Sequence, residues 1–177
     1  MDLRTQRTRR SIINAFIELR AAKPLEKITV KELSEKALIN KATFYQHFSD
    51  IYELSEFLET EAIETVFQSI PHVNSLMENP AEGCRELFCA LCNQSALVNI
   101  LFSGSRQPLL ISQLEPKIKA AVYSAHPEYE SDLEKEVLLT VLIQGNAGAF
   151  SAYRHADQRQ VIDILAKISE CLAKGFF

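Results

Sequence analysis

The sequence has no long hydrophobic run, and this absence is the first constraint on its function. No stretch approaches the roughly 18 or more apolar residues of a membrane span, and the run LLTVLI at residues 138–143 lies in a segment that also carries charge. The charged N-terminus, MDLRTQRTRRS, is not followed by the apolar region of a secretory signal. We therefore expect a cytoplasmic protein with no membrane partner.

Catalytic and metal-binding patterns are also missing. No phosphate-binding loop, nucleophile–base set or metal-ligand cluster stands out, so we expect no enzymatic activity, no cofactor and no metal site. Cys84, Cys89 and Cys92 have the C-x4-C-x2-C spacing of plant-type ferredoxins, but the segment CRELFCALC favours a helix over a loop around a cluster. Buried thiols acting as small hydrophobic residues are the favoured interpretation, and a redox-sensing role is the alternative.

Strand signals are weak, and helical periodicity runs through the chain without internal repeats or low-complexity linkers. These patterns predict an all-α fold of about nine helices. Thr29 and Glu32 form a capping-box pattern, Asn40 is a second predicted N-cap, and Pro116 should kink or split its helix. The predicted helices cover approximately 5–22, 30–37, 41–48, 51–70, 80–93, 96–102, 108–124, 131–155 and 158–174.

Positive charge is concentrated at one end of the chain. Residues 1–48 contain ten Lys or Arg and five Asp or Glu, a balance of +5. Residues 49–177 contain nine Lys or Arg and eighteen Asp or Glu, a balance of −9. A basic end on an acidic body is typical of a protein that binds an anionic partner at that end, with chance clustering as the alternative.

Residues 41–48, KATFYQHF, form a short predicted helix with an uneven distribution of side chains. At about 100° per residue, Phe44 and Phe48 share one face. The opposite face and its flanks carry Ala42, Thr43, Tyr45, Gln46 and His47. No Asp or Glu occurs between Leu38 and Ser49. Because a merely solvated face usually mixes charges of both signs, this absence favours an anionic partner.

The outer face of this helix suits the major groove of DNA, which is about 12 Å wide and admits a helix. Gln46 and Thr43 can reach base edges, and Ala42 can contact a thymine methyl group. The residues that can reach phosphates on either wall of the groove are Lys41, Tyr45 and His47. For Tyr45 or His47 taken alone, a position at the edge of the core is the simpler interpretation.

The segment ITVKELSEKALINKATFYQHFSDIYEL follows a helix of the form RRSIINAFIELRAAKPLEKI. These residues, about 8–56, resemble the N-terminal DNA-binding domain of the TetR (tetracycline repressor) family of bacterial transcription regulators. The common form of the family core is close to A-G-V-S-x-x-T-x-Y-x-H-F. The resemblance implies a helix-turn-helix DNA-binding domain at residues 1–50 and a helical regulatory and dimerisation domain at residues 51–177.

The same resemblance implies contacts with phosphate or groove for Thr29, Lys41, Thr43, Tyr45 and His47, whereas Ala42 and Gln46 would vary with the operator. Two positions depart from the family pattern. Leu38 occupies the turn position that is usually glycine, so either a left-handed conformation is strained there or the turn differs. Ile51 and Tyr52 stand where a lysine is often found, although the Tyr52 hydroxyl can still donate to a phosphate.

The acidic part of the chain would form a homodimer through its last two helices, again by the family resemblance. The candidate interface consists of small residues on the penultimate helix and aliphatic residues on the last: Gly145, Gly148, Ala149, Ala152, Ile162, Leu165, Ile168 and Leu172. The alternative is that both stripes serve the core of a single chain.

A pocket for a small-molecule effector is expected among the helices of residues 60–150. Aromatic side chains at helical spacing belong to a core more often than to a pocket. The candidate lining residues are Phe67, Phe88, Cys92, Leu101, Phe102, Tyr123, Gln144 and Phe150.

Together these patterns predict a dimeric, ligand-responsive transcriptional repressor that binds a palindromic operator in double-stranded DNA. An inducer would move the helices of the acidic body, the long helix at residues 51–70 would swing, and the two recognition helices would lose the spacing of the operator. The alternative is a TetR-like co-activator or adaptor that acts mainly through protein–protein contacts, which the residues at Leu38 and Tyr52 would suit.

Overall fold

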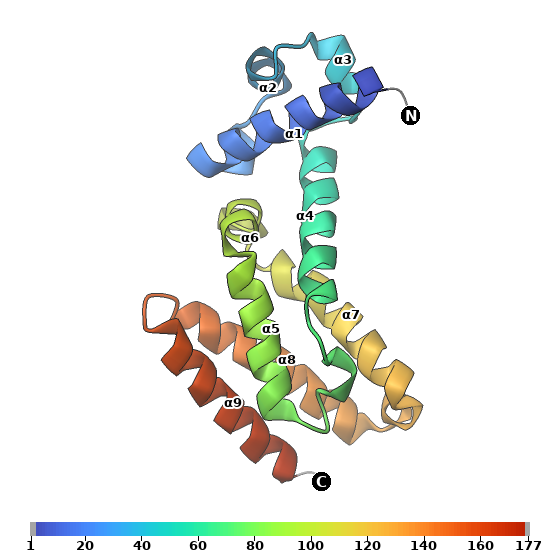
Figure 1. Ribbon diagram of the computed structural model, residues 1–177, viewed down its shortest axis with the longest axis vertical. Helices are drawn as coiled ribbons and strands as arrows, with labels where there is room; N and C mark the ends of the chain where they lie inside the picture. Colours follow the sequence, from blue (N-terminus) through green and yellow to red (C-terminus); the bar gives the residue numbers. More distant parts are fainter. Residues whose placement is uncertain (1–2, 176–177) are drawn as a thin grey trace. The chain divides into compact units, whose positions relative to one another are not determined.

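The computed structural model describes residues 3–175 and confirms the predicted all-α fold. Within this range the chain forms nine α-helices, four short 3-10 helices and no strand (Figure 1). The α-helices are α1 (Leu3–Ala22), α2 (Val30–Lys36), α3 (Lys41–Tyr45), α4 (Ile51–Gln68), α5 (Pro80–Asn93), α6 (Ser95–Leu101), α7 (Leu109–Ala125), α8 (Leu133–Ala152) and α9 (Gln158–Lys174). The 3-10 helices are η1 (Leu25–Lys27), η2 (Val73–Ser75), η3 (Gly104–Arg106) and η4 (Pro127–Ser131).

Capping residues define where several helices begin, as the sequence predicts. The Thr29 side chain accepts a hydrogen bond from the Glu32 backbone N–H at 3.2 Å, so α2 begins at Val30. The Asn40 Oδ1 accepts from the Thr43 N–H at 2.7 Å at the start of α3. Asp157 caps α9 in the same way, and that helix has the predicted bounds.

Several helices differ from their predicted bounds by one or two residues, and three show larger differences in bounds or continuity. The regular part of α3 ends at Tyr45, because the His47 N–H bonds to the Phe44 carbonyl in a tighter, 3-10-type turn. Pro116 does not split α7, which continues on both sides of the missing N–H bond. Helix α8 begins at Leu133, because the Asp132 side chain caps it by accepting hydrogen bonds from the N–H groups of Glu134 and Lys135. The residues before this cap form η4.

Contacts between Cα atoms divide the chain into two compact units. The described residues up to Ala62, together with Ser95–Gln107, form the head unit. Ile63–Gln94 and the described residues from Pro108 onward form the body unit. This grouping differs from the expected boundary after residue 50, since the first part of α4 belongs to the head unit and α6 packs against α1.

The head unit is organised around the apolar stripe of α1. Ile12, Phe16 and Leu19 recur at the helical spacing of three or four residues and are buried. The buried hydrophobic residues that the following segments add include Leu33, Phe44, Phe48, Leu54 and Leu58. The core therefore holds α2 and α3 by one face and leaves their other faces exposed.

The body unit is a packed set of longer helices. Helix α5 packs against α9, α8 packs against both α7 and α9, and η2 packs against α5 and α7 (Figure 1). None of the described helices combines the length and hydrophobicity needed to cross a membrane.

Candidate nucleic-acid interface

The turn between α2 and α3 has the hydrogen-bond pattern of a Schellman motif. The Ile39 N–H bonds to the Ser34 carbonyl at 3.0 Å, and the Leu38 N–H bonds to the Glu35 carbonyl at 3.2 Å. This motif requires a left-handed residue after the helix cap, usually glycine. Leu38 adopts this left-handed conformation with φ of 56°. Of the two possibilities that the sequence leaves open, a left-handed Leu38 or a different turn, the structure has the left-handed Leu38.

Helix α3 is anchored by two aromatic residues. Phe44 and Phe48 are 0% and 3% exposed, as the helical spacing predicts. The Tyr45 ring packs edge-on against Phe44 with ring centroids 5.5 Å apart. The Arg9 guanidinium lies 5.1 Å from the centroid of the Phe48 ring, which ties α1 to the end of this segment.

The predicted DNA-contacting residues all belong to the head unit, on α3 and the turn that ends it, at the start of α2 and at the start of α4. Tyr45 is 56% exposed and Tyr52 is 49% exposed. The other exposed members of the set are Thr29, Lys41, Ala42 and Gln46, and the half-buried members are Thr43 and His47.

Two of these side chains already form hydrogen bonds within the protein. The Thr43 hydroxyl donates to Asn40 Oδ1 at 2.9 Å, so its methyl group and oxygen lone pairs are what it can offer to a partner. The Thr29 hydroxyl oxygen is the N-cap acceptor of α2. Within the part of the chain that the structure describes, Lys41 forms no ion pair.

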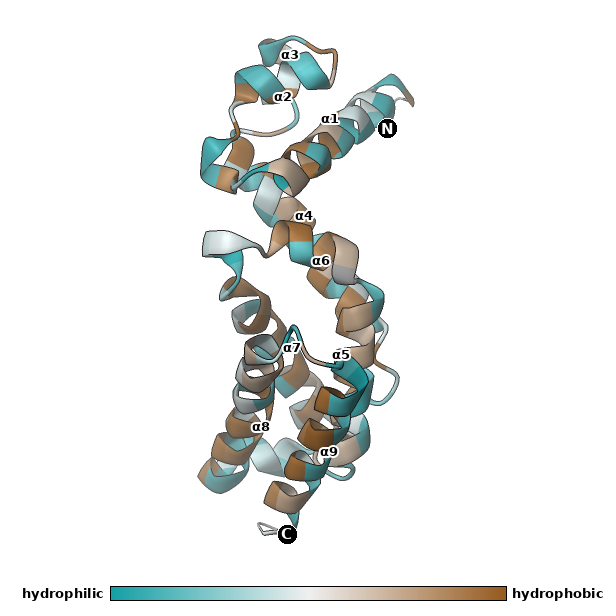
Figure 2. Cartoon of the chain, turned by 90° about the vertical axis from the view of Figure 1, so that its left-hand side faces the viewer, coloured by the Kyte–Doolittle hydropathy of each residue, from teal (hydrophilic) through white to brown (hydrophobic). Residues whose placement is uncertain are grey.

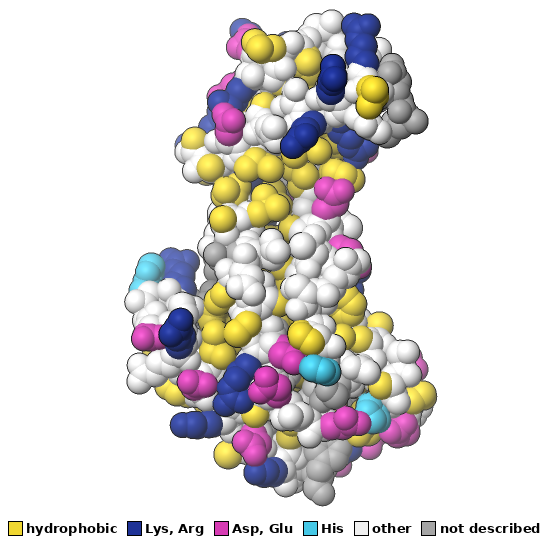
Figure 3. Space-filling model, viewed as in Figure 1, with side chains coloured by type: hydrophobic (Ala, Val, Ile, Leu, Met, Phe, Trp, Pro, Cys, Tyr) yellow, Lys and Arg dark blue, Asp and Glu magenta, His cyan; other side chains and the backbone are white. Residues whose placement is uncertain are grey.

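Carboxylates near this surface are held by neighbouring groups. Glu32 forms an ion pair with Lys23, and Glu18 pairs with Lys36 at 2.6 Å. The Ser49 N–H and hydroxyl donate to the Glu53 carboxylate at 2.5 and 2.6 Å, which lowers the pKa of Glu53. Lys and Arg side chains are distributed over the head unit on the face shown in Figure 3, where they are dark blue. The exposed part of α3 carries one positive charge, Lys41, beside side chains that can form hydrogen bonds.

Arg20 is a charged residue that is buried in the head unit, at 4% exposure. Its guanidinium donates to the Leu101 carbonyl at 2.9 Å and to the Ser103 hydroxyl at 3.0 Å. Burial lowers the pKa of this guanidinium. The spacing of four residues from Phe16 to Arg20 could have indicated the shared face.

A buried ion pair forms a second polar contact in the head unit. The Glu59 side chain is fully buried and accepts from Arg106 Nε and Nη2 at 2.9 and 2.5 Å. The Ser55 hydroxyl donates to the same carboxylate at 2.7 Å. The hydrogen bonds with Glu59 raise the pKa of Arg106. Sequence reasoning missed this pair, since its members are 47 residues apart.

The residues proposed for an effector pocket are divided between the two units. Leu101 and Phe102 are buried in the head unit, whereas the others lie in the body unit. Phe88 stacks on Phe150 with ring centroids 4.4 Å apart. The body unit has a recess with an empty volume of about 260 Å³ that includes open solvent, and Phe88 is the one predicted residue among its lining residues. Because this volume includes open solvent, the enclosed space is smaller still, whereas ligand pockets usually measure about 300–1,000 Å³.

The predicted dimer residues fall into two groups. Ile162 and Leu165 are buried within the body unit, and Ala149 is half-buried. The exposed members are Gly145, Gly148, Ala152, Ile168 and Leu172. A Cβ atom added to either glycine would meet nothing within 4 Å.

Further exposed aliphatic residues extend this surface at intervals of four residues. They are Leu133, Val137 and Val141 on α8 and Ile164 on α9. Helices α8 and α9 pack against each other, and brown hydrophobic positions occur along both in Figure 2. We refer to Leu133, Val137, Val141, Gly145, Gly148, Ala152, Ile164, Ile168 and Leu172 as the α8–α9 stripe.

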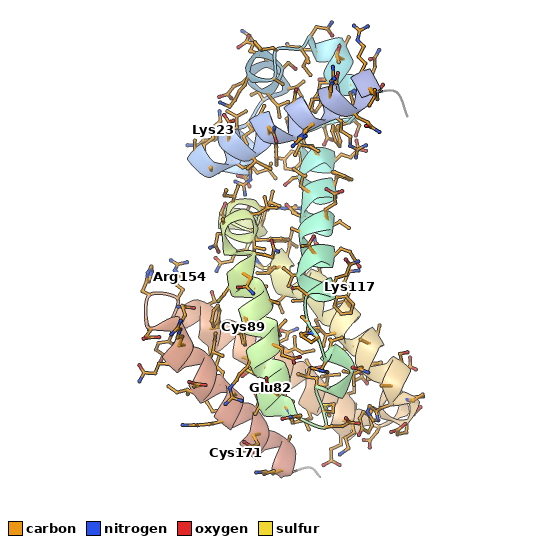
Figure 4. The ribbon with its side chains drawn as sticks, viewed as in Figure 1. Lys23, Glu82, Cys89, Lys117, Arg154 and Cys171 are labelled. Carbon is orange, nitrogen blue, oxygen red and sulfur yellow. The ribbon has the colours of Figure 1, made fainter. Side chains whose placement is uncertain are left out.

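The cysteines of the body unit have different environments. Cys84 is buried, which raises the pKa of its thiol to about 11, as expected for a small hydrophobic residue. Cys89 on α5 and Cys171 on α9 are exposed (Figure 4), and Cys92 is half-buried. The prediction of buried thiols is therefore correct for Cys84 and wrong for Cys89. All three cysteines of the C-x4-C-x2-C pattern lie on the helix α5.

Within residues 3–175, no group of three or more His, Cys, Asp or Glu side chains is placed to hold a metal ion. No protein-family model matches the chain, and no curated protein matches it.

Proposed function

We propose that the protein is a DNA-binding transcriptional regulator, a ligand-responsive repressor that binds a palindromic operator as a homodimer. The observation that carries this proposal is the exposed face of α3. It combines Lys41 and the small side chain of Ala42 with Gln46, the C-cap of the helix, and no carboxylate occurs in residues 38–48. Such a face suits the edges of bases and the phosphates that line a major groove.

The side chains of this surface divide into two roles. Ala42, Thr43 and Gln46 face the bases, where an amide and a methyl group can discriminate between base pairs. Lys41, Tyr45 and His47 bind the phosphates on the walls of the groove, and Thr29 and Tyr52 bind phosphates from the starts of α2 and α4. The buried Phe44 holds these groups in a fixed orientation.

A homodimer completes the recognition site. One helix of five residues reads few base pairs, and two copies related by a two-fold axis double the contacts on a palindrome. The α8–α9 stripe is the surface that we assign to the second copy. Its exposed aliphatic residues gain from burial, and the open space over Gly145 and Gly148 allows close approach of helices.

The segments that connect the two units would transmit the effect of an effector from the body unit to the DNA-binding surface. The chain crosses from one unit to the other within α4, between α5 and α6, and between η3 and α7. Arg20 and the Glu59–Arg106 pair bind α6, η3 and α4 together inside the head unit. An effector that rearranges the helices of the body unit therefore acts on the segments that carry α3.

Selection from a pool of random DNA duplexes tests this proposal. We expect enrichment of a palindrome at moderate salt, followed by tight binding in a gel-shift assay. The variant Lys41→Ala, Tyr45→Phe should bind more weakly, and the slope of log affinity against log salt should fall by about one for each lost contact between Lys41 and a phosphate.

Arg159→Ala is the matched control, since it removes one exposed positive charge from α9, outside the α8–α9 stripe. Its affinity and salt slope should equal those of the unmodified protein. No enriched palindrome, or an unchanged salt slope in the α3 variant, would argue for the protein–protein adaptor instead.

A further inference from the structure

Leu38 is held in a backbone conformation that leucine disfavours. Its φ of 56° lies in the left-handed region, and it is the one residue other than glycine with positive φ among those described. A Cβ atom in this region approaches the neighbouring carbonyl oxygen, so glycine would adopt the same turn at a lower conformational energy. The two Schellman hydrogen bonds need the conformation but not the leucine side chain.

The leucine side chain itself does little within the described residues to compensate for this strain. Leu38 is 92% exposed, more than any other large hydrophobic residue that the structure describes. Its side chain therefore adds almost nothing to the core of the head unit. A residue that is both strained and exposed is a sign of an external contact, because strained positions cluster at functional sites.

The surroundings of Leu38 indicate what that contact is. Ala42 and Lys41 are exposed on the helix that follows the turn, and no carboxylate occurs from Leu38 to Phe48. A partner at this position must offer an apolar surface beside negative charge. The thymine methyl groups and the deoxyribose faces of DNA lie next to phosphates and meet both requirements.

We propose that Leu38 packs against an apolar surface of the operator duplex, a thymine methyl group or a deoxyribose face, beside the bases that α3 contacts. This inference rests on the proposed function and adds Leu38 to the residues that touch DNA. The side chain contributes affinity in the complex at the expense of a strained turn in the free protein.

Three substitutions separate the side chain from the backbone strain. Leu38→Gly removes both, Leu38→Ala removes most of the side chain but keeps the strain, and Leu38→Met keeps an apolar side chain of similar size. The affinity of each variant for the duplex enriched by the unmodified protein is measured together with its midpoint of thermal unfolding.

We expect Leu38→Gly and Leu38→Ala to bind about fivefold more weakly per half-site, since each loses the burial of the leucine side chain. Leu38→Met should bind nearly as well as the unmodified protein. The midpoint of thermal unfolding should rise by a few degrees for glycine alone, because glycine alone relieves the strain. Weaker binding by a more stable variant is a result that loss of folding cannot produce.

Replacement of each thymine in the duplex by deoxyuridine distinguishes the two apolar surfaces. If the contact is a methyl group, one such position weakens binding of the unmodified protein and has no further effect on Leu38→Gly. If no position behaves in this way and Leu38→Gly still binds more weakly, the contact is the deoxyribose.

Equal affinity of Leu38→Gly and the unmodified protein would overturn this inference while leaving the proposed function intact. Failure of the unmodified protein to enrich any duplex would overturn both.

Discussion

The head unit and the body unit place polar and apolar groups in opposite ways. The head unit buries the charged residues Arg20 and Glu59, the latter paired with the half-buried Arg106, and exposes the donor-rich face of α3. The body unit buries mainly aliphatic residues and exposes the aliphatic α8–α9 stripe. Exposed groups determine which partner a surface can bind, so the difference favours an anionic partner for the head unit and an apolar partner for the body unit.

The buried charges of the head unit are better understood as specifying an arrangement than as adding stability. Removing two charges from water costs free energy that their attraction only partly returns. The Glu59–Arg106 hydrogen bonds fix the position of η3 relative to α4. We hypothesise that this pair makes the position of α3 sensitive to any movement of η3 or α4.

The largest expected effect comes from breaking that buried pair. Glu59→Ala should lower the free energy of unfolding by about 3–5 kcal/mol, because it leaves Arg106 without its buried partner. The matched change in the body unit is Glu64→Ala, where the carboxylate pairs with Lys117 at 2.8 Å on a partly exposed surface. That loss should be about 1 kcal/mol or less.

Urea denaturation followed by circular dichroism measures both losses. The double variant Glu59→Met, Arg106→Met should recover most of the stability, since no charge is then left unpaired. Similar losses for Glu59→Ala and Glu64→Ala would contradict the contrast between buried charges in the head unit and surface charges in the body unit.

The next effect concerns the exposed surface of the body unit. Ile168→Glu places a carboxylate on the α8–α9 stripe, and burial of that charge in a dimer is strongly unfavourable. We expect the dimer dissociation constant to rise by about a hundredfold or more, as measured by analytical ultracentrifugation. Arg159→Glu introduces a carboxylate elsewhere on the same helix and should leave the dimer intact. Equal dimerisation of the two variants would remove the stripe from the interface.

A smaller effect separates stability from binding. Asn40→Ala in the head unit and Asp157→Ala in the body unit each remove an N-cap hydrogen bond and should each lower the free energy of unfolding by about 1 kcal/mol. Only Asn40→Ala should weaken DNA binding, because Asn40 orients Thr43 and the first turn of α3. Thermal unfolding and gel-shift assays on the two variants make the comparison, and equal affinities would argue against α3 as the DNA-reading helix.

The smallest effect is a titration in the body unit. The hydrogen bond between His72 Nδ1 and the Glu86 carboxylate, at 2.6 Å, raises the pKa of His72. The pair therefore contributes its stability in full below the pKa of the unfolded chain and loses it as pH rises through the higher pKa of the folded protein.

Titration of the His72 ring by NMR should show that Glu86→Gln lowers the pKa of His72. Glu82→Gln should produce a smaller decrease, because Glu82 acts on His72 only through its charge. A larger effect of Glu82→Gln would show that the hydrogen bond is not the main cause.

Local signals in the sequence determined the helices and the face that α3 exposes. Caps such as Thr29 and Asn40 act within four residues, and the spacing of Phe44 and Phe48 acts within one turn of helix. Interactions of this range depend on neighbouring residues alone, so a pattern in the sequence predicts them. The bounds of α9 were predicted for the same reason.

The tertiary structure decided which polar groups are buried and how the chain divides into units. Arg20 meets Leu101 across 81 residues and Glu59 meets Arg106 across 47 residues, so no local pattern reports either contact. The same distant contacts assign α6 and η3 to the head unit. The sequence raised the question of Leu38, but the folded turn was needed to show its left-handed backbone and its exposed side chain. Both depend on where the neighbouring helices leave space, which is a property of the packed chain.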